Sequence, residues 1–214
     1  MNHTALIYLD IETGPNPVKP DYPPFKVSNG ATKPETIQKQ KDEYELIKEE
    51  LRDAVWRKQS LDPLRGTIIC LSFAIDDGEV VSLVGEEKDI LMKFEDVVRD
   101  VPYGEFICFN GKRFDFVWLF YRAVKYGLKV LRDILPHTRN ANNVTDVMEL
   151  FSATSYGSDS WVSLDSLAKF LGLPCKESQG SEIHDMYLKG EIDKIVEHCE
   201  LDVKLVRDIY NLTK

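Results

Sequence analysis

Two acidic residues near the start of the chain have the spacing of metal ligands. Asp10 and Glu12 are two residues apart in a mostly apolar run, and because the side chains of a strand alternate between its faces, both carboxylates project to the same side. Such hard oxygen ligands select Mg²⁺ or Mn²⁺. With 36 acidic residues among 214, about six such pairs arise by chance, so two solvated acids are the alternative. Their position before a Gly-Pro turn, where a sheet presents its edge, favours a functional site.

Two later segments each add an acidic residue that we expect at the same place. Residues 110–115 read Asn-Gly-Lys-Arg-Phe-Asp, where an apolar strand ends and an apolar helix begins at Asp115. The alternative role for Asp115 is an acid that stabilises the helix N-terminus by about 0.3 to 1 kcal/mol. On the last predicted helix, His198 and Asp202 are four residues apart and share one face. An ordinary surface histidine would explain that spacing as well.

The elements that must position these residues follow an α/β pattern. Apolar runs predict strands over residues 4–13, 67–75, 79–85 and 105–110, and the turn at 76–78 joins the second and third as a hairpin. Apolar residues at helical spacing predict helices over 88–100, 114–127, near 144–151, over 163–174 and from about residue 190. Ser163 is the expected N-cap of its helix. We expect Asp146 to cap a helix and not to bind a metal.

Residues 15–64 interrupt the strand pattern. A proline-rich stretch is followed by a charged helical segment, 34–58, which carries six Lys/Arg and seven Asp/Glu. This balance favours a packing or lid element over a clamp for DNA. The aromatic residues of the proline-rich stretch and of the later polar loop have side chains able to stack on unpaired bases, although packing within the protein is the favoured role; they are Tyr22, Phe25, Tyr156 and Trp161.

The composition is that of one ordinary globular domain over residues 1–214. The chain is 43% hydrophobic and 29% charged, and its net charge of -9 argues against a protein that coats polyanions. Its four cysteines, at 70, 108, 175 and 199, show no paired spacing. No apolar run approaches the roughly 20 residues that a membrane span needs. We therefore expect a reduced, cytoplasmic protein without a membrane partner.

Three motifs, taken together and in this order, resemble those of the DEDD superfamily of 3′ to 5′ exonucleases. They are DIET at 10–13, NGKRFD at 110–115 and HCELD at 198–202. The likeness is greatest to stand-alone bacterial and phage exonucleases related to the proofreading domain of family B DNA polymerases, and it covers residues 4–14 and about 66–212. It implies an RNase H-like α/β fold, a mixed β-sheet flanked by helices, with 15–64 as an inserted segment.

The resemblance also implies roles for individual residues. The metal-binding carboxylates would be Asp10, Glu12, Asp115 and Asp202, holding two Mg²⁺ or Mn²⁺ ions per site. His198 would be the catalytic base or would orient the attacking water. Residues beside these motifs are expected to bind substrate, and they are Thr13, Asn110, Lys112 and Arg113.

One spacing departs from the family pattern. One subgroup of the superfamily has His-x₄-Asp and another has Tyr-x₃-Asp, whereas this chain has His-x₃-Asp at 198–202. A separation of four residues is slightly more than one helical turn, whereas a separation of five turns the side chain about 140° away. We therefore expect His198 to occupy the place of the tyrosine. Glu197, at the other spacing, is a poor substitute for a histidine.

The expected reaction is hydrolysis of the terminal phosphodiester at the 3′ end of single-stranded DNA, which releases nucleoside 5′-monophosphates. The expected protein partners are replication or repair proteins. An exoribonuclease acting on RNA is an alternative, because contacts to the 2′-OH have no clear sequence signature. A non-catalytic nucleic-acid-binding domain is another, although four carboxylates would repel phosphates. Residues 112–139 carry seven basic side chains in an otherwise acidic chain and are candidates to bind phosphates. A solvated helix face is the favoured explanation for each of them except Lys112 and Arg113, which flank the proposed site.

Overall fold

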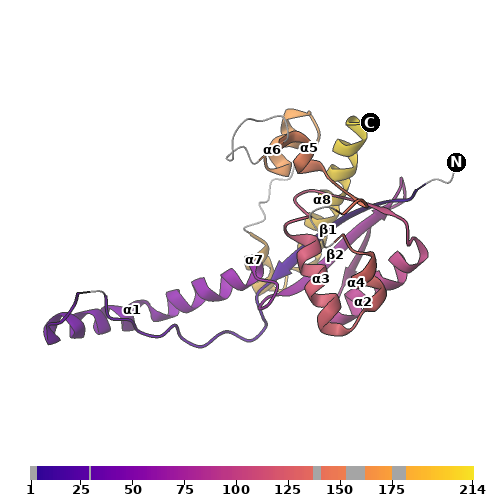
Figure 1. The fold of residues 1–214 in the computed structure, drawn as a ribbon. Coiled ribbons are helices and arrows are strands. Elements are labelled where there is room, and N and C mark those ends of the chain that lie inside the picture. The colour runs from indigo at the N-terminus through magenta and orange to yellow at the C-terminus, as the bar shows by residue number, and fades with distance from the viewer. Residues whose placement is uncertain (1–3, 29, 137–140, 153–161, 175–181) are drawn as a thin grey trace. The chain divides into compact units, whose positions relative to one another are not determined.

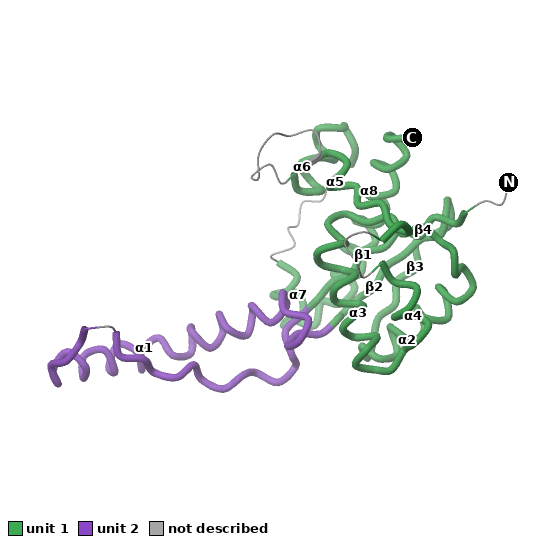
Figure 2. Tube along the Cα trace, in the orientation of Figure 1, with its two compact units in different colours: residues 1–13, 68–214 green, residues 14–67 purple. Residues whose placement is uncertain are grey.

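The computed structural model describes residues 4–28, 30–136, 141–152, 162–174 and 182–214. The chain divides into two compact units, which Figure 2 shows in different colours. We call residues 1–13 and 68–214 the sheet unit and residues 14–67 the inserted unit. Every residue that the sequence predicts to be functional lies in the sheet unit.

The sheet unit is built on a five-stranded mixed sheet with the order β3-β2-β1-β4-β5. β2 and β3 pair antiparallel as the predicted hairpin, whereas β4 runs parallel to both β1 and β5. β1 therefore occupies the centre of the sheet. Its consecutive residues Ile7, Tyr8 and Leu9 are all buried, so the strand is covered on both faces. The strands are β1 (Leu6–Gly14), β2 (Thr67–Ile75), β3 (Val81–Val84), β4 (Glu105–Cys108) and β5 (Val144–Asp146).

The helices follow the predicted pattern with additions. The described helices are α1 (Pro34–Lys58), the 3₁₀ turn η1 (Gln59–Leu61), α2 (Glu87–Asp100), α3 (Asp115–Tyr126), α4 (Lys129–Ile134), α5 (Val147–Ser152), α6 (Leu164–Phe170), α7 (Ile183–Lys189) and α8 (Ile192–Leu212). The sequence pattern did not predict the short helices α4 and α7. As predicted, Ser163 caps α6, its hydroxyl accepting a hydrogen bond from the Ser166 N–H.

The prediction of a helix near 144–151 is wrong in its first half. Residues 144–146 form strand β5, which pairs parallel with β4, and helix α5 begins only at Val147. A strand of three residues is too short to display an alternating pattern. Its conformation is set by hydrogen bonding to a neighbouring strand, for example from the Phe106 N–H to the Asn143 carbonyl at 2.8 Å.

Helices cover both faces of the sheet (Figure 1). α2, α3 and α4 pack on one face, where a large apolar cluster includes Ile7, Leu9 and Ile11 of β1. α8 crosses the opposite face, where Tyr8 of β1 packs with Val203 and other residues of α8. The alternation along β1 therefore continues from Tyr8 to Asp10 and Glu12 on the α8 side. This arrangement brings the first and last predicted motifs together.

The inserted unit is held by its own polar and aromatic contacts. No residue of α1 is buried. The Arg52 guanidinium lies 4.5 Å from the centre of the Tyr22 ring, and the Phe25 and Tyr44 rings lie 5.6 Å apart. These contacts confirm the packing role favoured for Tyr22 and Phe25, whereas Tyr156 and Trp161 lie outside the described residues. A lid function for the segment stays a prediction.

Within the part of the chain that the structure describes, we find no helix with the length and apolarity to cross a bilayer.

Candidate active site

One cavity of the sheet unit, of about 230 Å³, gathers the predicted chemistry. Its walls come from the end of β1, the loop after β4, the first turns of α3 and α6, and the middle of α8. The lining residues are Asp10, Ile11, Glu12, Phe109, Asn110, Phe114, Asp115, Leu164, Asp165, His198 and Asp202. All five residues predicted to be catalytic are among them, although the three motifs are about 90 residues apart in sequence.

The tightest cluster joins β1 to α8. His198 Nδ1 lies 2.8 Å from Glu12 Oε1 and 3.6 Å from Asp202 Oδ2. Each of the three residues offers a ligand atom, and these atoms lie within 4.8 Å of one another, which is a separation that a single cation can bridge. The four-residue spacing of His198 and Asp202 thus places both groups beside Glu12. The histidine side chain is only 5% exposed, so it is not an ordinary surface residue.

Asp115 reaches the same cavity from the first turn of α3. Its carboxylate Oδ1 accepts a hydrogen bond of 3.0 Å from the Ile11 N–H, between the two acids of β1. Burial, with smaller contributions from the charges of Asp146 and Glu12, raises the pKa of the Asp115 carboxyl to about 7, against the opposing effect of two main-chain N–H groups. An acid that only complemented the helix dipole would have no reason to be buried against strand β1.

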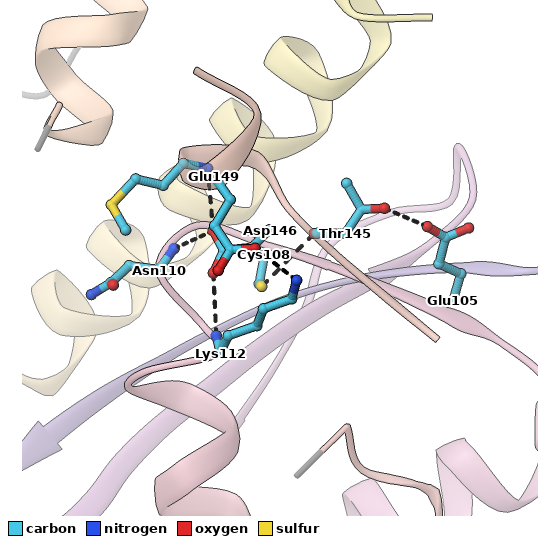
Figure 3. A network of polar contacts seen from close by, with 8 residues as sticks. Glu105, Cys108, Asn110, Lys112, Thr145, Asp146 and Glu149 are labelled. Atoms are coloured by element: carbon cyan, nitrogen blue, oxygen red, sulfur yellow. Dashed lines mark hydrogen bonds and ion pairs between the residues drawn. The ribbon is translucent and has the colours of Figure 1, made fainter. Parts of the chain in front are cut away.

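The loop before Asp115 has a conformation that its sequence explains. Asn110 has a positive φ of 60°, a conformation that asparagine adopts more readily than most residues. A Cβ at Gly111 would lie 2.6 Å from the Cys108 side chain, so only glycine fits. The Asp146 carboxylate accepts hydrogen bonds from the N–H groups of Asn110, at 2.8 Å, and Lys112, at 3.2 Å (Figure 3).

Asp146 has two structural tasks in this network. Besides holding the loop, it accepts a hydrogen bond from the Met148 N–H at the start of α5, which confirms the predicted capping role. Burial raises the pKa of its carboxyl, although the three main-chain donors oppose this effect. Asp146 does not line the cavity. Sequence reasoning missed its contact with the loop because the two segments meet only through the pairing of β4 with β5.

The predicted substrate contacts divide into two groups. Asn110 lines the cavity, whereas Thr13, Lys112 and Arg113 do not. Thr13 is buried, the Lys112 ammonium lies 2.7 Å from the Glu149 carboxylate, as Figure 3 shows, and Arg113 is exposed. A role for these three residues in binding substrate stays a prediction.

Part of the basic segment has a structural function. Arg122 is buried, and its Nε lies 3.0 Å from a carboxylate oxygen of Glu87 on α2. Lys125 contacts the same carboxylate at 3.4 Å, and the Tyr126 hydroxyl donates to it at 2.6 Å. Arg122 therefore joins α3 to α2 and is not available for phosphates. Arg139 lies outside the described residues.

Cys199 also contacts the site, although none of the sequence motifs predicted a role for it. Its Sγ lies 3.3 Å from Asp10 Oδ2 and 3.4 Å from the Asp10 main-chain oxygen. Burial, together with the nearby Cys70 thiol and the charge of Asp10, raises the pKa of the Cys199 thiol well above its ordinary value. No sequence signal pointed to this contact, because the two residues are 189 positions apart.

Comparison with known proteins identifies a family for the chain. A protein-family profile described as a predicted 3′-5′ exonuclease related to the exonuclease domain of PolB matches residues 67–206. The matched range includes Asp115, His198 and Asp202 but begins after β1. No curated protein matches the sequence.

The fold is also found in solved structures. The chain is similar to the family B DNA polymerase from the hyperthermophilic archaeon Pyrobaculum calidifontis, with 14% sequence identity and a TM-score of 0.56. The match covers 99% of this chain and 24% of the polymerase chain, so the protein spans about a quarter of that enzyme's length. The likeness confirms the predicted RNase H-like fold, a mixed sheet flanked by helices. By its sequence, the chain belongs to the family of predicted 3′-5′ exonucleases related to the exonuclease domain of PolB.

Proposed function

We propose that the protein is a metal-dependent 3′-5′ exonuclease that removes nucleoside 5′-monophosphates from the 3′ ends of single-stranded DNA. One observation carries the proposal: the four predicted carboxylates and His198, from three distant segments, line a single cavity together with Asp165 of α6. The fold places three of these groups within reach of one cation and buries a fourth. Such an arrangement of like charges has no structural benefit and is suited to binding cations.

The donor set fits hard divalent ions. Two carboxylates 4 Å apart repel by roughly 4 kcal/mol at an effective dielectric constant of 20, so the cluster gains from cations that neutralise it. The residues that would hold the ions are Asp10, Glu12, Asp115 and Asp202. When bound, two Mg²⁺ or Mn²⁺ ions supply a water of lowered pKa and stabilise charge on the attacking and leaving oxygens. Among the described residues, the lining offers carboxylate oxygens, one histidine and no cysteine, which favours these ions over Zn²⁺.

His198 acts on the attacking water in the proposed reaction. Its ring is held against Glu12 and Asp202 in the middle of α8, so its orientation is fixed before substrate binds. An imidazole in this place removes a proton from the attacking water or orients that water. The water oxygen then bonds to the terminal phosphorus, the bond to the 3′ oxygen breaks, and that oxygen takes up a proton.

The apolar part of the lining suits a nucleoside. Phe109, Phe114 and Leu164 supply apolar surface beside the acidic residues, and aromatic side chains bind unpaired bases by stacking. The cavity volume of about 230 Å³ is below that of most small-molecule sites. This size favours a single terminal nucleotide over a stretch of duplex, in agreement with an exonuclease.

Labelled oligonucleotides test the proposal. The full chain is incubated with single-stranded DNA and RNA that carry a label at the 3′ or the 5′ end, in Mg²⁺, Mn²⁺ or EDTA. We expect 3′-labelled DNA to release labelled mononucleotide at once, 5′-labelled DNA to shorten stepwise, and EDTA to stop both. Asp202→Asn should abolish the reaction, whereas the matched variant Asp208→Asn, an exposed acid on the same helix, should not.

Three results would change the conclusion. Activity retained in Asp202→Asn or in EDTA would reject the metal-carboxylate mechanism. Faster shortening of RNA than of DNA would make the protein an exoribonuclease with the same site. Binding of oligonucleotides without cleavage under every condition would support a non-catalytic domain.

A further inference from the structure

The thiol of Cys199 links the two elements that carry the candidate site. Cys199 follows His198 on α8, and its Sγ contacts both the carboxylate Oδ2 of Asp10, at 3.3 Å, and the main-chain oxygen of the same residue, at 3.4 Å. Both distances are within the range for a hydrogen bond that involves sulfur. One side chain of α8 therefore contacts both the backbone and the acid of β1, and its single S–H group donates to one of these two oxygens at a time.

The surroundings of the thiol keep this contact in place. Cys199 has no exposed surface and packs in an apolar cluster with Ile69, Ile183 and Ile195. Water has no access to replace the thiol as a donor to Asp10 on that side. The side chain also has few rotamers, because it is short and enclosed. The position of the Cys199 sulfur beside Asp10 is therefore fixed by its apolar surroundings, with the Cys70 thiol as a neighbour in the same cluster.

We infer that Cys199 is a positioning residue for the proposed metal site, and that its S–H group orients the Asp10 carboxylate toward the cavity. The inference rests on the proposed function, since it concerns the affinity of that site for cations. Hydrogen bonds from outer residues to ligating carboxylates typically change metal affinity or activity 10- to 100-fold.

The chemistry of a thiol suits this task. A lysine or arginine at position 199 would neutralise Asp10 and compete with the cation, whereas a neutral S–H group is a weak donor that leaves the full negative charge in place. A carboxylate has about four acceptor positions, so one contact on Oδ2 leaves capacity for a metal ion. Cys199 thus fixes the direction of the ligand without reducing its charge.

Mn²⁺ binding measured by calorimetry or electron paramagnetic resonance, in the full chain without nucleic acid, tests the inference. We expect Cys199→Ala to raise the Mn²⁺ dissociation constant about 10- to 100-fold. Cys199→Ser keeps a donor and should lie closer to the wild type. Cys199→Val fills the space without a donor, so it should behave as Cys199→Ala does, and it serves in place of the alanine variant if that variant does not fold.

Ile195→Val is the matched control for packing. Ile195 lies one helical turn before Cys199 in the same cluster, is fully buried, and loses one methyl group without any polar contact. Its thermal unfolding midpoint should fall about as far as that of Cys199→Ala, but its Mn²⁺ affinity should remain that of the wild type.

The outcomes separate the inference from the function. If the wild type binds Mn²⁺ and the donor-free variants bind it equally well, the positioning role is overturned while the proposed function stands. Equal weakening in Ile195→Val would assign the effect to packing and would also overturn the role. If the wild type binds no Mn²⁺, the proposed metal site itself fails, and the inference fails with it.

Discussion

Asp115→Asn provides a direct test of the reasoning about buried charge. Asp115 is 4% exposed, and burial is the main reason that the pKa of its carboxyl rises from the ordinary 3.8 to about 7. The native state therefore binds a proton more tightly than the unfolded chain does. The resulting stability is complete below the ordinary pKa and is lost as the pH rises through the folded-state value.

The magnitude follows from the two pKa values. Each pH unit between them is worth about 1.4 kcal/mol, so the metal-free protein should lose about 3 kcal/mol of unfolding free energy between about pH 5 and pH 8 through Asp115. Asparagine does not ionise, and its Oδ1 atom can still accept the hydrogen bond from the Ile11 N–H. The variant should therefore gain stability relative to the wild type as the pH rises, while losing all metal-dependent turnover.

Urea denaturation in EDTA, followed by circular dichroism at several pH values, measures this difference. Asp96→Asn, an exposed acid on α2, is the control and should follow the wild type at every pH. Saturating Mg²⁺ should restore the stability of the wild type at high pH but have little effect on Asp115→Asn. If wild type and Asp115→Asn lose the same free energy between pH 5 and pH 8, the reasoning about the buried carboxylate is refuted.

Three further substitutions test separate parts of the structure. His198→Ala should lower the hydrolysis rate by roughly 10² to 10⁴, and an unchanged rate at pH 7 to 8 would remove His198 from the chemistry. Gly111→Ala should destabilise the fold by about 1 to 3 kcal/mol, because the new Cβ would lie 2.6 Å from Cys108; unaltered stability in a denaturation experiment would contradict the described loop. Arg122→Ala removes the nearest cation from buried Glu87, which keeps Lys125 and the Tyr126 hydroxyl as partners, so about 1 to 3 kcal/mol of stability should be lost. A loss of oligonucleotide affinity without a loss of stability would instead show that Arg122 binds phosphates of the nucleic acid.

Local patterns in the sequence were sufficient for the elements that carry the site. β1 and α8 are marked by long apolar patterns, and the spacing of Asp10 with Glu12, and of His198 with Asp202, fixes the face on which each pair lies. These inferences need only the geometry of one strand or one helix. The structure then places both faces at one cavity.

Features that depend on distant contacts could not be read in this way. β5 has three residues, and its pairing with β4 defines it. The hydrogen bond from the Asn110 N–H to Asp146 depends on that pairing. The contact of Cys199 with Asp10 depends on the crossing of α8 over β1. In each case the residue type is common and its neighbours in sequence are unremarkable, so only tertiary structure reveals the partner.

The site is recognisable because its residues oppose the stability of the fold. Burying Asp115 beside other acids raises the free energy of the metal-free native state, and a protein selected for stability alone would place an apolar residue there. The neighbouring structure counteracts this strain with neutral donors, namely the Ile11 N–H for Asp115 and the Cys199 thiol for Asp10. These donors hold the carboxylates without neutralising them. The remaining charge is then available to cations, and cation binding should both stabilise the protein and prepare it for catalysis.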